Sequence, residues 1–96
     1  MTVRDLSLET KLIQLAEEAS ELSQAALKLV RARRGETPVG ELQAARDLLE
    51  EIADVNVCLV AIDPDQYAVE AIMRKKACRW ERRLNDTKRR EDRPDD

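Results

Sequence analysis

The chain has 96 residues, of which 39% are charged and 43% hydrophobic, and its formal net charge is −3. A chain this short forms one small domain with a marginal core, and its acidic balance disfavours a nucleic-acid ligand. Two cysteines are too few for a disulfide framework, and no apolar run is long enough to cross a bilayer. The first residues lack an apolar signal core, so we expect a cytoplasmic protein.

The spacing of apolar residues predicts three helices and therefore an all-α fold. Phe is absent and there are only two glycines and three prolines, all of them outside the long periodic stretches. The last residues contain no apolar side chain, which predicts a frayed or disordered tail. We expect helices over about 7–34, 41–62 and 64–84, a loop over 36–40 and a tail over 85–96.

Residues that favour helix ends stand at the predicted boundaries. Ser7 is a plausible N-cap of the first helix, and Gly35 is a suitable C-terminal stop after it. Asp63 can cap the third helix, with Pro64 at its first position and Gln66 closing a capping box.

Each predicted helix carries an apolar stripe with the spacing of packed helices. The second half of the second helix is also apolar on its other side, at Ala53, Val57 and Val60. A helix of that kind is buried on several faces, so we expect a homo-oligomer, dimer or tetramer, that completes a four-helix bundle. The stripes are Leu8, Leu12, Leu15, Ala19, Leu22, Ala26 and Leu29 in the first helix; Leu48, Ile52, Val55, Leu59 and Ile62 in the second; and Val69, Met73, Ala77, Trp80 and Leu84 in the third.

Two acidic motifs carry most of the functional information. Glu18 and Glu21 lie three residues apart on the first helix, and Glu51 and Asp54 have the same spacing on the second. Each pair projects from one side of its helix, along the edge of the apolar stripe. Antiparallel packing of the stripes would bring the pairs together, and four clustered carboxylates repel one another unless a cation neutralises them.

Oxygen ligands favour Mg²⁺, with Mn²⁺ as a possible substitute, and the absence of histidine excludes His-based metal and catalytic sites. The competing interpretation is that glutamates form a solvated helix face, which is common. Two matched pairs beside apolar stripes favour the metal site.

The third helix offers basic residues that could hold phosphate. Lys76, Arg79 and Arg83 share one face beside the stripe. The same residues could simply complement the helix dipole, and these two interpretations are evenly balanced. Trp80 falls on the stripe, which favours core packing over stacking on a base. Asn56 is either an interface contact or a base-reading amide.

Together these residues resemble the MazG-like branch of the all-α nucleoside triphosphate pyrophosphohydrolases. The resemblance spans roughly 8–84, within one helical domain over 1–84, and is closest to the compact single-domain versions of phage genomes. It implies that Glu18, Glu21, Glu51 and Asp54 ligate Mg²⁺. It also implies that phosphate is contacted by Lys76 and Arg83, together with Arg79 and Lys28. The resemblance rests on the segments 15–28, 49–55 and 76–84.

The function that this resemblance implies is Mg²⁺-dependent hydrolysis of a nucleoside triphosphate to its monophosphate and pyrophosphate. One of the four carboxylates, or neighbouring Glu17, would take the proton from water. The nucleotide base is left open because the chain is nearly devoid of aromatic residues. The alternative is a non-catalytic helical oligomer with a regulatory role. A nucleic-acid binder is a weaker third interpretation.

Overall fold

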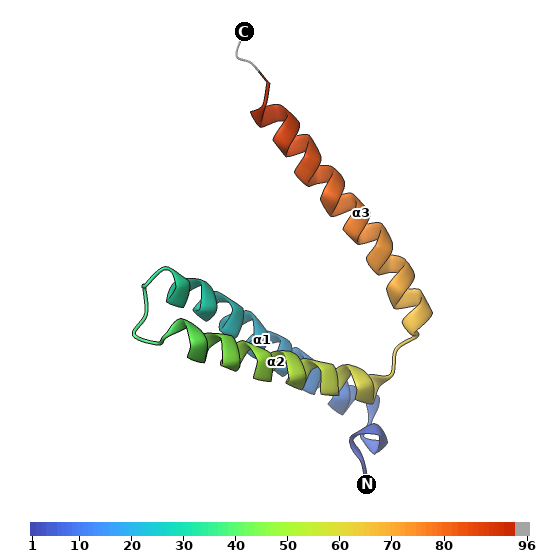
Figure 1. Cartoon of the computed structure of the whole chain (residues 1–96). Coiled ribbons are helices and arrows are strands. Elements are labelled where there is room, and N and C mark those ends of the chain that lie inside the picture. Colours follow the sequence, from blue (N-terminus) through green and yellow to red (C-terminus); the bar gives the residue numbers. More distant parts are fainter. Residues whose placement is uncertain (94–96) are drawn as a thin grey trace. The chain divides into compact units, whose positions relative to one another are not determined.

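The computed structural model describes residues 1–93, and all regular structure within them is helical. A short 3₁₀ turn, η1 (Val3–Asp5), precedes the helices α1 (Leu8–Arg33), α2 (Glu41–Ile62) and α3 (Gln66–Glu91) (Figure 1). The three predicted helices and the all-α class are confirmed. The chain divides into two compact units, Met1–Asp63 and Pro64–Asp96. Among the helices of residues 1–93, none combines the length and hydropathy that a bilayer crossing requires.

The ends of α1 follow from the capping residues that the sequence provides. Ser7 Oγ accepts a hydrogen bond from the backbone N–H of Thr10 at 3.1 Å. At the other end Gly35 has φ of 69°, and the N–H of Glu36 reaches back to the carbonyl of Arg31 at 2.9 Å. This is a Schellman motif, in which the left-handed position favours glycine. The predicted start and stop of α1 are both correct.

The first unit is a hairpin of α1 and α2, which lie side by side in Figure 1. A short loop joins two helices that run antiparallel, as short helix connections require. The buried side chains at this contact are small, larger ones such as Leu22 and Val55 are half-buried, and η1 contacts α2. Small residues allow the two helix backbones to approach closely. The buried residues of the hairpin are Ala25, Ala44, Cys58 and Ala61.

The face through which the two helices meet overlaps the predicted one only in part. The half-buried members of the predicted stripes are Leu15, Leu22 and Leu29 in α1 and Leu48, Val55 and Ile62 in α2. Leu12 and Ile52, both on the predicted stripes, are 47% and 39% exposed, whereas Ala25 and Cys58 are buried. Each helix is therefore rotated about its axis relative to our expectation. The reason is that both helices carry more than one apolar row, and periodicity alone does not tell which row meets the neighbour.

The junction between α2 and α3 corrects the predicted cap. Asp63 adopts the left-handed conformation, with φ of 53°, and its N–H donates to the carbonyl of Leu59. It therefore ends α2. The cap of α3 is Asp65, whose Oδ1 accepts the N–H of Ala68 at 3.1 Å. Two acidic residues flank the proline, and the one after it takes the capping role.

The second unit consists of α3, which by itself is a single helix. It runs seven residues beyond the predicted end at Leu84 because no glycine or proline interrupts 85–91, and basic residues in its last turn complement the helix dipole. The last part of the predicted tail, 94–96, lies outside the described residues. Within this unit no residue of α3 is buried and Trp80 is 69% exposed, so the core role of Trp80 stays a prediction. A lone helix has no second element to cover its stripe.

Candidate metal centre

The structure brings the four predicted carboxylates together on the hairpin. One oxygen from each of Glu18, Glu21, Glu51 and Asp54 can be chosen so that all four lie within 4.8 Å of one another. All four residues belong to the first unit, so a single chain supplies the complete set.

Local geometry explains this convergence. The i, i+3 spacing places Glu18 and Glu21 on one side of α1, and Glu51 and Asp54 on the matching side of α2. The two helices run antiparallel, so the first member of each pair lies level with the last member of the other. The negative charges of Glu21 and Asp54 both act on Glu18, as this pairing requires.

Two oxygens of the cluster are buried and lack a partner. Glu18 Oε1 accepts a hydrogen bond from Gln14 Nε2 at 2.8 Å. Glu18 Oε2 and Glu51 Oε2 are inaccessible to solvent, and neither has a hydrogen-bond partner within residues 1–93. A buried acceptor without a partner destabilises the fold. A bound cation would satisfy both atoms at once.

The electrostatic surroundings favour a cation. Burial raises the pKa of Glu18, the hydrogen bond from Gln14 partly offsets this, and the charges of Glu21 and Asp54 raise the pKa further. Burial also raises the pKa of the Cys58 thiol, and the charges of Glu18 and Asp54 act in the same direction. Burial is the larger cause of both shifts, and the neighbouring carboxylates add a negative potential that a divalent ion would neutralise.

The chemistry of the donors fits a hard divalent ion. Four carboxylates provide oxygen ligands only, which is the set that Mg²⁺, Mn²⁺ and Ca²⁺ prefer over zinc or copper. Glu21 and Asp54 are exposed while Glu18 and Glu51 are half-buried. A cation held here would therefore keep an open side toward solvent, where water or a substrate oxygen can bind.

An open groove of about 550 Å³ continues from the cluster along the hairpin. Glu21 and Glu51 line its acidic part, and Lys28 and Arg31 contribute positive charge. Lys28 Nζ lies 3.9 Å from Asp47 Oδ2, a long and partly exposed ion pair that leaves the ammonium group able to bind another anion. Four carboxylates and two cations thus line one groove.

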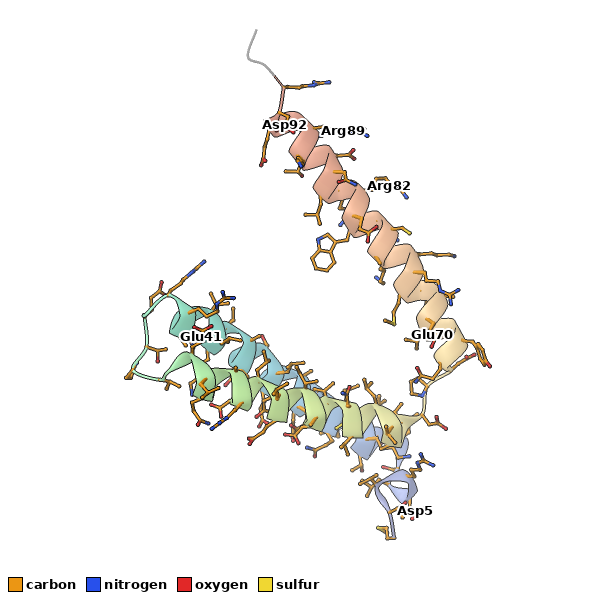
Figure 2. The ribbon with its side chains drawn as sticks, in the orientation of Figure 1. Asp5, Glu41, Glu70, Arg82, Arg89 and Asp92 are labelled. Atoms are coloured by element: carbon orange, nitrogen blue, oxygen red, sulfur yellow. The ribbon has the colours of Figure 1, made fainter. Side chains whose placement is uncertain are left out.

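The other predicted phosphate ligands lie on α3, in the second unit. Lys76, Arg79 and Arg83 are all exposed on this helix. Arg79 also lines a shallow hollow of about 430 Å³ with three further basic residues, Arg74, Lys75 and Arg82 (Figure 2 labels Arg82). The basic character of α3 is therefore broader than the predicted row.

Two residues of the site escaped the sequence analysis. Gln14 orients Glu18 by its hydrogen bond, and Arg31 lines the groove beside Lys28. A usable signal was present: Gln14 precedes Glu18 by one helical turn, and Arg31 follows Lys28 at i, i+3 on the side of α1 that carries Glu21. By contrast, Glu17 is exposed and is not one of the four clustered carboxylates.

No protein-family model matches the sequence, and comparison with curated proteins and with solved structures finds no significant match. Functional inference therefore rests on the residues and their geometry.

Proposed function

We propose that the chain is a Mg²⁺-dependent nucleoside triphosphate pyrophosphohydrolase of the MazG-like type, which releases a nucleoside monophosphate and pyrophosphate. One observation carries the proposal. Four carboxylates from two helices meet within 4.8 Å of one another, and two of their oxygens are buried without a partner. Such a cluster is costly for a protein that does not use it to bind a cation.

The groove offers a division of roles along a triphosphate. The four carboxylates would hold the ion, whose chemical contribution is to neutralise phosphate charge and to lower the pKa of a bound water. Lys28 and Arg31 would bind phosphate oxygens farther along the groove and orient the chain of phosphates. One of the exposed carboxylates, Glu21 or Asp54, would accept the proton of the attacking water. The bond between the α- and β-phosphates would then break.

We further propose that the chain acts as a homo-oligomer. The hairpin leaves large apolar side chains exposed on both helices, including Leu27 at 57% on α1 and Leu42 at 67% on α2. Burial of such residues in an oligomer would add stability that a small domain lacks.

The same exposed surface favours a second candidate, a non-catalytic helical oligomer that uses the hairpin only for assembly. This alternative predicts that metal ions leave the thermal stability unchanged and that no pyrophosphate is released. The nucleic-acid interpretation has support only from the basic character of α3. A strongly salt-dependent affinity for DNA or RNA would favour it.

A pyrophosphate-release screen over the ribo- and deoxynucleoside triphosphates, with Mg²⁺ and with a chelator, tests the proposal. We expect release that requires Mg²⁺ and that Glu21→Gln or Asp54→Asn reduces by at least about 100-fold, the order of effect of removing a transition-state contact. Glu9→Gln, on the same helix but outside the cluster, is the matched control. Activity that survives both substitutions in the cluster would refute the assignment.

A further inference from the structure

Gln14 contacts the carboxylate cluster but has no role in the proposed reaction. It lies on α1 one helical turn before Glu18, and its Nε2 donates to Glu18 Oε1 at 2.8 Å. A carboxylate can only accept hydrogen bonds, so the amide must turn its nitrogen toward Glu18. Within residues 1–93, Glu18 is the only one of the four clustered carboxylates that accepts a hydrogen bond from an amide.

This hydrogen bond makes the two oxygens of Glu18 different from each other. Oε1 is held by Gln14, whereas Oε2 is inaccessible to solvent and has no hydrogen-bond partner within residues 1–93. The last torsion of a glutamate side chain is soft, and its rotation could bring both oxygens to a cation. The bond from Gln14 restricts that rotation. Glu18 therefore offers a cation one oxygen, Oε2, rather than two.

The number of oxygens that a carboxylate offers influences which ion binds. Mg²⁺ is small and requires nearly ideal octahedral geometry, which the narrow bite of a bidentate carboxylate disturbs. Ca²⁺ is larger, accepts about 6–8 oxygens in flexible arrangements, and takes carboxylates in either monodentate or bidentate form. A Glu18 that is held in monodentate form therefore favours Mg²⁺ over Ca²⁺.

A second glutamine makes the same bond away from the cluster. Gln43 Nε2 donates to Asp47 Oδ1 at 2.8 Å, again across four residues of one helix and again at an exposed position. Asp47 is not one of the four clustered carboxylates. Pairs with this spacing stabilise a helix by similar small amounts, so loss of either bond should affect folding alike. Only the bond from Gln14 acts on the cluster.

We propose that Gln14 is a positioning residue of the metal centre, which holds Glu18 in monodentate form and so makes the centre prefer Mg²⁺ over Ca²⁺. Groups that hydrogen-bond to metal ligands commonly fix the orientation of those ligands and tune the metal in this way. The inference rests on the metal centre of the proposed function. Its experiment measures metal binding without nucleotide, so it is independent of hydrolysis.

Isothermal titration calorimetry of the full chain, with Mg²⁺ alone and with Ca²⁺ alone, tests this role. The informative quantity is the ratio of the two dissociation constants, because a change in net charge or in fold stability affects both divalent ions alike. Gln14→Met keeps the approximate length and helix propensity of the side chain but removes the donor. We expect it to shift the ratio toward Ca²⁺ by about 10-fold, the lower end for groups that orient metal ligands, because this bond is exposed.

Two further variants separate the hydrogen bond from other effects of substitution. Gln43→Met loses the equivalent bond on α2 and should keep the wild-type ratio. Gln14→Lys retains a donor at the same position and should also keep that ratio, although its positive charge lowers both affinities. Circular dichroism in chelator should show the same helix content in all variants.

Three results would overturn the positioning role and leave the metal centre intact: an unchanged ratio in Gln14→Met, an equal shift in Gln43→Met, or a shift in Gln14→Lys as large as that in Gln14→Met. Wild type that binds neither ion would overturn the metal centre and this inference together. The expected ratios without any release of pyrophosphate would support this inference and refute hydrolysis alone.

Discussion

Removal of a single carboxylate from the cluster should separate metal binding from folding. Glu51 is half-buried, and its Oε2 lacks a partner within residues 1–93. Glu51→Gln keeps the size and helix propensity of the side chain but replaces one anionic oxygen ligand with an amide. Glu50→Gln is the matched control because Glu50 is adjacent, exposed and not among the four clustered carboxylates.

The expected magnitude follows from binding linkage. A cation at 100 times its dissociation constant stabilises the folded state by about 2.7 kcal/mol. In a domain of this size, 1 kcal/mol shifts Tm by about 4–8 °C, so Mg²⁺ or Mn²⁺ should raise Tm by roughly 11–22 °C. If the loss of one ligand weakens binding at least tenfold, the stabilisation at the same metal concentration falls to about 1.4 kcal/mol or less. The rise in Tm should then be halved or smaller.

Thermal unfolding followed by circular dichroism measures this effect, with and without metal and at one protein concentration, since oligomerisation makes Tm concentration-dependent. We expect the full rise for wild type and Glu50→Gln and a reduced rise for Glu51→Gln. Two results would refute the reasoning: no metal-dependent rise in wild type at millimolar Mg²⁺ or Mn²⁺, or an equal rise in wild type and Glu51→Gln.

Four further outcomes are expected from the structure. The pKa of Glu18 is raised, so the metal-free folded state keeps this proton to a higher pH than the unfolded state does. The unfolding free energy should therefore fall as pH rises from the ordinary pKa of 4.5 through the folded pKa. Urea unfolding in the presence of chelator should show this fall, and Glu18→Gln should diminish it. Lys28→Ala should lower the unfolding free energy in urea by less than about 1 kcal/mol, because the ion pair of Lys28 with Asp47 is long and partly exposed. The same substitution should raise the KM for triphosphate. Ala44→Leu, at a position that is 0% exposed, should lower the unfolding free energy by about 1–3 kcal/mol through overpacking, and no loss would contradict the close helix contact. Asp63→Gly should stabilise the chain by up to about 1 kcal/mol, because Asp63 has φ of 53°; a loss in Tm would argue against that conformation.

The boundaries of α1 were accessible from the sequence because local chemistry decides them. Ser7 caps α1 through its own hydroxyl, and Gly35 ends it by adopting a conformation that other residues resist. The predicted cap of α3, Asp63, was wrong because Asp63 and Asp65 can both cap, and only the backbone between them decides which one ends α2 and which one begins α3.

The carboxylate cluster was predictable for a related reason. A spacing of three residues puts each pair on one side of its helix, whatever the helix packs against. A short loop then makes the two helices antiparallel, which brings the pairs to the same level. The contribution of Gln14 and Arg31 was not recognised, although both lie at helical spacing from residues that were.

The rotation of each helix about its own axis was decided only by the tertiary structure. Sequence periodicity identifies apolar rows, and both α1 and α2 carry more than one. Small residues lie at the centre of the contact within the hairpin, where Ala25, Ala44 and Ala61 are buried. This choice leaves Glu18 and Glu51 half-buried and Leu12, Leu49 and Ile52 exposed. The amino-acid sequence determines which residues share a side of a helix, while the packing of one helix against another determines which side is covered.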